Sequence, residues 1–216
     1  MDIAKNTIFI SFFTKNGKYP ELAKKLKKSL LKFNLEYDIK AVEPFPSWIE
    51  GTHFKPKLTL DLLLQYRKNL VFLDIDTEIW KMPELLFGDH DFAIYNWLAD
   101  KNHHLENSIL YDPKSKQLLG SGGVMKFGYT APAINLLINW IRLLPQNPTM
   151  VDDQVLDKAF NTSNLELNTL WLPKIYNRMD KHSSYWSEIP NEEVVINHDF
   201  EARSPSTFSS NFDNFI

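Results

Sequence analysis

Two aspartates one residue apart, Asp74 and Asp76, close the apolar stretch VFLDID and are the strongest chemical signal in the sequence. Residues two apart on an extended strand point to the same side, so both carboxylates would face one point in space. Because two negative charges that close repel each other, a divalent cation is their natural partner. The pair therefore predicts a metal site, and the alternative is an ordinary strand end with a turn-forming aspartate.

The elements that must position this pair are predicted by apolar runs and by helical periodicity. TIFISFFT predicts a strand that ends near Thr14 before a loop at Lys15, EYDIKAV predicts a second strand, and NLVFLDID predicts a central strand covered on both faces. YPELAKKLKKSLLKF predicts a helix with Pro20 at its start and five lysines on a solvated face. PFPSWIEGTHFKP is typical of a loop, with the next helix beginning at Pro56.

Strand, helix, strand, helix and strand within the first 76 residues predict an α/β fold with an open, mostly parallel central sheet flanked by helices. Ligands of such sheets bind outside the carboxyl ends of the strands. We therefore expect Thr14, Lys15 and Asp74 to border the ligand site. Asn96 and Trp97, at the end of the predicted strand DFAIYNW, belong to the same set of candidate binding residues.

The second half of the chain is less regular. GSGGVMKF indicates a turn that feeds a strand, and an amphipathic helix is expected between Pro132 and Leu144. DDQVLDKAF predicts another helix with Asp152 or Asp153 as its cap, Asp152 fitting this role better. LELNTLWLP and EVVINHDF are plausible late strands, and the serine-rich tail, residues 204–216, is expected to be loosely held and to dock on the body.

Composition limits the class of protein. With 216 residues, 44% of them hydrophobic, the chain is long enough for one domain with one sizeable core. The net charge of −3 gives no general basic footprint for nucleic acid, so small molecules or proteins are the expected partners. There is no cysteine for a disulfide, no apolar run of roughly 20 residues that would span a bilayer, and no cleavage signal, so a cytoplasmic location is expected. A peripheral membrane contact through the lysine-rich helix stays open.

Five segments, in order, resemble the GT-A nucleotide-sugar glycosyltransferases. They are FKPKLTLDLLLQY, the strand ending in DID, GSGGVMKF, VDDQVLDKAF and VVINHDFEAR. The resemblance is strongest to small bacterial members akin to the retaining galactosyl- and glucosyltransferase families. It spans roughly residues 8 to 203, so residues 1–203 are expected to form one GT-A domain.

The resemblance implies a metal site and its ligands. Asp74 and Asp76 match the DxD pair that holds Mn²⁺ or Mg²⁺ and touches the donor ribose, and His198 matches the late histidine that completes the site. An imidazole ligand suits Mn²⁺ better than Mg²⁺, so Mn²⁺ is the expected cofactor.

The resemblance also implies roles around the donor. Lys55 matches a basic position near the nucleotide phosphates, although it would otherwise be taken as a solvated loop lysine. After the histidine the chain departs from the family, with DFEARS in place of the usual basic and small residues, and Arg203 is the candidate for the phosphate-pairing role there. Gly122 and Gly123 match a small-residue turn beside the donor. The catalytic candidates are Asp153 and Gln154, which match the position that faces the transferred sugar; a helix cap is the competing role for Asp153.

The implied activity is metal-dependent transfer of a hexose, with retention, from a UDP-sugar to a glycan or a lipid-linked acceptor, as in the biosynthesis of bacterial surface polysaccharides. Two alternatives stay open. One is a noncatalytic or hydrolytic nucleotide-sugar-binding protein with the same fold, and the other is a metal-dependent phosphoester hydrolase that uses the same carboxylates.

Overall fold

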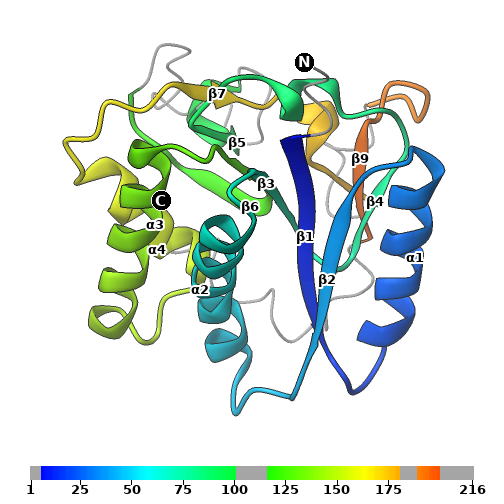
Figure 1. The fold of residues 1–216 in the computed structure, drawn as a ribbon, viewed down its shortest axis with the longest axis horizontal. Coiled ribbons are helices and arrows are strands. Elements are labelled where there is room, and N and C mark those ends of the chain that lie inside the picture. Colours follow the sequence, from blue (N-terminus) through cyan, green and yellow to red (C-terminus); the bar gives the residue numbers. More distant parts are fainter. Residues whose placement is uncertain (1–5, 101–115, 181–188, 200–216) are drawn as a thin grey trace.

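A six-stranded sheet forms the centre of the computed structural model, which describes residues 6–100, 116–180 and 189–199. The strand order is β2-β1-β3-β6-β5-β7; β1 is parallel to β2 and β3, β7 is parallel to β5, and β6 runs antiparallel to β3 and β5 (Figure 1). The predicted α/β class with a mostly parallel sheet is confirmed. Its strands are β1 (Thr7–Thr14), β2 (Tyr37–Val42), β3 (Asn69–Leu73), β5 (Phe92–Asn96), β6 (Gly120–Phe127) and β7 (Thr169–Trp171).

A second, three-stranded sheet has the order β4-β9-β8. Its strands are short: β4 (Thr77–Ile79), β8 (Arg178–Asp180) and β9 (Ile196–Asp199). β9 was predicted from the sequence, whereas β4 and β8 were not, because three residues are too few to show an alternating pattern. β4 follows the aspartate pair directly and is antiparallel to β9, so the small sheet joins two distant segments of the chain.

The helices lie on both faces of the large sheet. α2, α3 and α4 cover one face, and α1 covers the other together with the small sheet (Figure 1). No helix among the described residues is long and apolar enough to cross a membrane. The helices are α1 (Tyr19–Lys32), α2 (Trp48–Tyr66), α3 (Ala131–Leu143) and α4 (Asp152–Asn161), and the short 3₁₀ helices are η2 (Glu84–Phe87), η3 (Trp97–Ala99), η4 (Leu144–Gln146) and η5 (Lys174–Tyr176).

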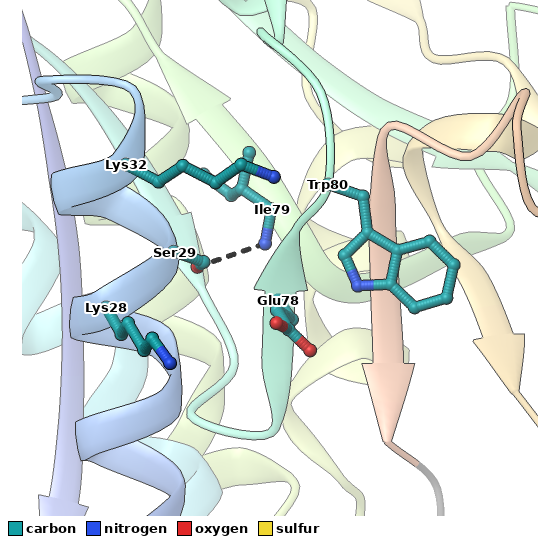
Figure 2. A pocket seen from close by; sticks show the side chains of 6 residues that line it. All are labelled: Lys28, Ser29, Lys32, Glu78, Ile79 and Trp80. Carbon is teal, nitrogen blue, oxygen red and sulfur yellow. Dashed lines mark hydrogen bonds between the residues drawn. The ribbon is translucent and has the colours of Figure 1, made fainter.

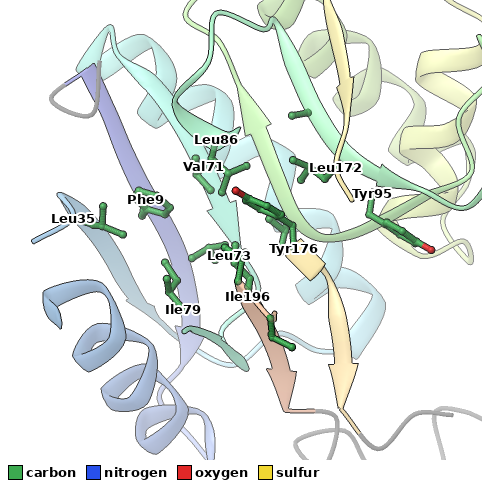
Figure 3. Packing of buried hydrophobic residues seen from close by; sticks show 14 of the residues in the cluster. Phe9, Leu35, Val71, Leu73, Ile79, Leu86, Tyr95, Leu172, Tyr176 and Ile196 are labelled. Atoms are coloured by element: carbon green, nitrogen blue, oxygen red, sulfur yellow. The ribbon is translucent and has the colours of Figure 1, made fainter. Parts of the chain in front are cut away.

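The core is split between the two faces of the sheet because side chains alternate along each strand. In β1, Ile8 and Ile10 pack against α2, α3 and α4, whereas Phe9 packs on the side of α1. Figure 3 shows this second cluster, in which Ile79 of β4 and Ile196 of β9 meet the large sheet. The small sheet is therefore anchored by apolar packing, which holds the residues at its end in place.

The predicted start of α2 is wrong. The helix begins at Trp48, and Pro56 lies inside it. Ser47 caps the helix by accepting a hydrogen bond from the backbone N–H of Glu50 at 3.2 Å. A Ser-x-x-Glu capping signature was thus present in the stretch taken for a loop, where the flanking prolines concealed it.

Gly122 and Gly123 do not form the predicted turn. Both lie inside β6, in a bulge where the register jumps from Ile94 opposite Met125 to Tyr95 opposite Ser121. Glycines suit such a bulge because the strand must detour locally. The prediction of a strand in GSGGVMKF is confirmed, but it begins at Gly120.

Candidate metal and nucleotide-sugar site

The aspartate pair lies in a tight turn and not on an extended strand as predicted. β3 ends at Leu73, and both the backbone N–H and the hydroxyl of Thr77 donate to the carbonyl oxygen of Asp74, at 3.0 Å and 2.8 Å. The N–H of Asp74 donates to the carbonyl oxygen of Gly123 at 2.8 Å. These bonds fix the turn between the two sheets, so Asp74 and Asp76 meet through the turn geometry.

His198 joins the two aspartates from the far end of the chain. It lies opposite Thr77 in the pairing of β4 with β9. One ligand atom from each of Asp74, Asp76 and His198 can be chosen so that all three lie within 4.8 Å of one another. His198 is 1% exposed, whereas both aspartates are partly exposed, so the cluster has a buried side and an open side.

Gly123 has no side chain, and the imidazole of His198 occupies the space that a side chain would fill. A Cβ atom added at Gly123 would stand 1.9 Å from Cε1 and 2.4 Å from Nε2 of His198, which is inside any allowed contact. The glycine is thus required by a side chain of the cluster itself. That Gly123 lies beside the donor, as the resemblance implies, stays a prediction.

Lys55 of α2 lies beneath the cluster, and the alternative of a solvated loop lysine is wrong. Its side chain is 7% exposed, and Nζ lies 3.0 Å from Oδ1 of Asp74 and 2.8 Å from Oδ2 of Asp152. Nζ also donates to the carbonyl oxygen of Gly122 at 3.2 Å and stands 5.1 Å from the ring centroid of Phe72. Lys55 therefore links α2, the aspartate turn, β6 and the start of α4.

The charge of Lys55 is held by its partners. Burial by itself would lower the pKa of this lysine, but the charges of Asp152 and Asp74, with their hydrogen bonds, outweigh burial and raise the pKa above its ordinary value. Lys55 is consequently a fixed positive charge at neutral pH. Its 3.0 Å contact with Oδ1 holds the carboxylate of Asp74 in one orientation.

α4 brings three more carboxylates toward β6. The N-cap of this helix is Val151, so the predicted capping role of Asp152 is wrong: its carboxylate binds Lys55. Asp153 accepts from the N–H of Gln154 at 2.8 Å, and its Cβ lies 3.3 Å from where a Cβ of Gly122 would stand. Asp153 therefore borders the same bulge of β6, with Gln154 next to it and partly exposed.

Asp157 was missed by the sequence analysis. Its Oδ1 accepts from the N–H of Gly120 at 2.8 Å and ties α4 to the start of β6. Burial raises the pKa of Asp157 to about 8; the bond from Gly120 opposes this shift, and the charges of Asp153 and Asp152 add to it. The sequence pattern that could have pointed to Asp157 is its spacing of four residues from Asp153, which puts both on the same side of the helix.

The other predicted binding residues lie at the same edge of the sheet but have different surroundings. Thr14 ends β1 and is partly exposed, and the exposed Lys15 forms an ion pair with Glu43. Asn96 is 1% exposed and accepts from the N–H groups of Leu98 and Leu119 at 3.2 Å and 3.1 Å, so it holds the neighbouring loop together.

Trp97 is 8% exposed and packs edge-on against Tyr95, with ring centroids 5.0 Å apart. The predictions for Arg203 and for the tail, residues 204–216, concern residues outside the described ranges.

Partly exposed aromatic rings stand beside Lys55. Phe12 near the end of β1 packs edge-on against Phe54 of α2, with centroids 5.1 Å apart, and Phe45 lies 5.3 Å from Phe54. Phe12 also lies 6.2 Å from Phe72, the ring beneath Lys55. Such rings offer flat apolar surface next to a positive charge, which suits an aromatic base attached to phosphate.

The chemistry of the donor set fits a divalent metal. Two carboxylates and one imidazole would hold such an ion, and a nitrogen ligand favours Mn²⁺ over Mg²⁺. Asp74 is the member of the set held by Lys55, which orients a carboxylate as outer partners of metal ligands do.

The fold is similar to that of solved glycosyltransferases. A glycosyltransferase involved in the glycosylation of the major capsid of PBCV-1 matches with a TM-score of 0.61 and 11% identity, over 89% of this chain and 91% of that chain. The galactosyltransferase LgtC, in complex with donor and acceptor sugar analogs, matches with a TM-score of 0.54 and 12% identity, over 88% of this chain and 86% of that chain. The chain thus has the GT-A fold of these enzymes.

At the level of sequence, no protein-family model and no curated protein matches this chain.

Proposed function

We propose that this protein is a metal-dependent glycosyltransferase that moves a hexose from a UDP-sugar to a glycan or a lipid-linked acceptor, with retention. The observation that carries the proposal is the convergence of Asp74, Asp76 and His198, whose ligand atoms lie within 4.8 Å of one another, at the edge of a sheet shared with solved glycosyltransferases. A group with this donor chemistry binds a divalent ion together with the oxygens of a diphosphate.

In the proposed reaction the bond between the anomeric carbon and the diphosphate oxygen breaks, the acceptor hydroxyl oxygen forms a new bond to that carbon, and the hydroxyl proton passes to the departing diphosphate. A bound Mn²⁺ would neutralise the negative charge of the departing nucleoside diphosphate. Asp74, Asp76 and His198 would hold the ion, and Lys55 would keep Asp74 in its orientation by their 3.0 Å contact.

The transferred sugar is assigned to the space beside the β6 bulge. Asp153 lies against Gly122 there, and its carboxylate would stabilise positive charge that grows at the anomeric carbon, with Gln154 orienting the sugar hydroxyls. The nucleoside is assigned to the neighbouring edge near Thr14, Lys15 and Phe12, because the ring of Phe12 packs against Phe72, the ring beneath Lys55. Asn96 would act through the loop that it holds.

The test is an assay of UDP release from a panel of UDP-hexoses with Mn²⁺, with and without simple sugar acceptors. We expect one donor to be preferred, release to stop when the metal is chelated, and an α-linked product, as retention from an α-linked donor requires. Asp153→Asn should lower turnover by about 100-fold or more, the scale of a lost electrostatic contact in the transition state. Asp61→Asn, a change of the same kind on an exposed position of α2, is the matched control.

Other outcomes select between the alternatives. UDP release without any transfer product across a broad acceptor panel favours a hydrolytic protein, whereas binding of the UDP-sugar without UDP release favours a noncatalytic binding protein. Release of inorganic phosphate from simple phosphoesters, with no preference for nucleotide sugars, favours a phosphoester hydrolase and contradicts the proposal.

A further inference from the structure

The outward face of α1 is strongly cationic. Leu22, Leu26 and Leu30 are buried against the core, so the apolar side of this amphipathic helix is already used. The only acid of the helix, Glu21, is engaged by Lys24 at 2.7 Å. We name these exposed residues of α1 the lysine face: Lys24, Lys25, Lys27, Lys28, Lys32 and, among them, Leu31.

Leu31 adds an exposed apolar side chain to this cationic face. It is 58% exposed, although it is a large apolar residue, and its helical position lies between those of the lysines. Further apolar side chains are exposed just after β4, where Met82 and Leu85 are each 40% exposed. Positive charge is thus combined with apolar groups in a chain whose net charge is −3.

A hollow of about 330 Å³ connects the lysine face with β4. Lys28 and Lys32 line it from α1, and Trp80 lines it from the end of β4, with Ser29, Glu78 and Ile79 at its floor and rim (Figure 2). The hydroxyl of Ser29 accepts from the N–H of Ile79 at 3.1 Å, so helix and strand are joined at this point. Trp80 is partly exposed, and the guanidinium carbon of Arg178 lies 5.5 Å from the centroid of its ring.

We propose that the lysine face and Trp80 form a docking surface for a membrane whose headgroups are anionic. Lysines at such a surface are attracted by phosphate groups, and their alkyl stems extend along the apolar layer. Tryptophan prefers the boundary between headgroups and acyl chains, and a leucine at the centre of a cationic face enters that layer. Charge complementarity together with exposed apolar groups favours a lipid surface over a soluble polyanion, which would leave Leu31 in water.

The surface would place the candidate site close to lipid. Trp80 follows Asp76 by four residues along β4, so the strand that leaves the aspartate turn ends at the hollow. This inference goes beyond the proposed function and does not depend on it, because lipid binding needs neither metal nor donor. The two proposals can therefore fail separately.

The experiment is cosedimentation of the full chain with vesicles of phosphatidylcholine alone and of phosphatidylcholine with a minor share of phosphatidylglycerol. We expect binding to the anionic vesicles only, weakened by salt, since exposed charges are screened. Lys28→Glu with Lys32→Glu should lower the partition coefficient by about tenfold or more, given the contribution of each basic residue near an anionic surface. Leu31→Ser and Trp80→Ala should weaken binding without abolishing it.

The matched control is Lys57→Glu with Arg142→Glu, which makes the same change in net charge at exposed positions on α2 and α3, on the opposite face of the large sheet. Circular dichroism verifies that each variant is folded. The proposal is overturned if the protein binds neutral vesicles equally well, or if the control variant loses as much binding. It is also overturned if Leu31→Ser and Trp80→Ala bind as the wild type does, because the surface would then be purely electrostatic and would suit any polyanion.

Discussion

Lys55 and Lys126 are two buried lysines that lie at opposite ends of β6. Lys55 is bound at the start of the strand by Gly122 and by two carboxylates. Lys126, near the end, is 1% exposed and donates to the carbonyl oxygens of Gly88 and His90. Burial lowers the pKa of Lys126 to about 8, although Asp91 and Asp89 oppose the shift, whereas the carboxylates beside Lys55 raise its pKa.

The difference teaches that burial alone does not decide the charge of a lysine. Neutral carbonyl oxygens solvate an ammonium group only in part, so burial leaves the pKa of Lys126 at about 8, well below its ordinary value. Two carboxylates in direct contact keep Lys55 charged. We interpret Lys126 as a structural link at the amino edge of the sheet and Lys55 as a functional charge at the carboxyl edge.

Replacing each lysine by methionine tests the two roles and has the largest expected effect. Lys55→Met would leave the carboxylates of Asp74 and Asp152 near each other without their shared cation, and should cost about 3 to 5 kcal/mol in the free energy of unfolding. Lys126→Met removes an ammonium group from neutral partners and should cost about 1 kcal/mol. Chemical denaturation measures both values, and equal losses would contradict the assignment of the two roles.

The glycines of β6 give the next largest effect. Gly123→Ala would push the imidazole of His198 away from the aspartates, so the affinity for Mn²⁺ should fall by about 10- to 100-fold. Gly120→Ala is the matched control at the start of the same strand. Its added Cβ would stand 2.8 Å from Cδ1 of Ile94 and 3.3 Å from Oδ1 of Asp157, so it should lower stability without a comparable loss of metal affinity. Calorimetric titration of Mn²⁺ separates the two, and an unchanged affinity in Gly123→Ala would remove His198 from the site.

Asp157 gives the smallest effect, and it concerns pH. Its pKa is raised from 3.8 to about 8, so the folded state favours the protonated carboxyl group; the stabilisation is complete below pH 3.8 and is lost as the pH rises toward 8. Asp157→Asn mimics the protonated form and should be more stable than the wild type at alkaline pH, with little difference in acid. Thermal unfolding across this pH range tests the prediction, and parallel pH profiles would refute it.

The central strand, the first helix and the three metal-ligand candidates were predicted from the sequence. The run from Leu70 to Leu73 predicted a central strand because continuous apolar residues require cover on both faces. The start of α1 followed from Pro20 and from the spacing of its buried leucines. Asp74, Asp76 and His198 were named together from a family resemblance, and the structure brings them together.

The rest depends on contacts that sequence spacing does not encode. β4 and β8 are strands only because β9 pairs with both of them. Gly123 must be a glycine because the imidazole of His198, 75 residues later in the sequence, occupies the place of a Cβ atom. Asp152 was predicted to be a helix cap because its position at the start of a helix was the only local pattern. Its partner, Lys55, comes from α2, and no local pattern links these two residues.

The most direct test of the central claim is calorimetric titration of UDP, with and without Mn²⁺, on the wild type, on Asp76→Asn and on the control Asp61→Asn. The account predicts that UDP binds tightly only with the metal, that Asp76→Asn loses this binding, and that Asp61→Asn keeps it. If UDP binds equally well without metal, or if Asp76→Asn binds as the wild type does, then Asp74, Asp76 and His198 are not a donor site and the proposed glycosyltransferase activity fails with them.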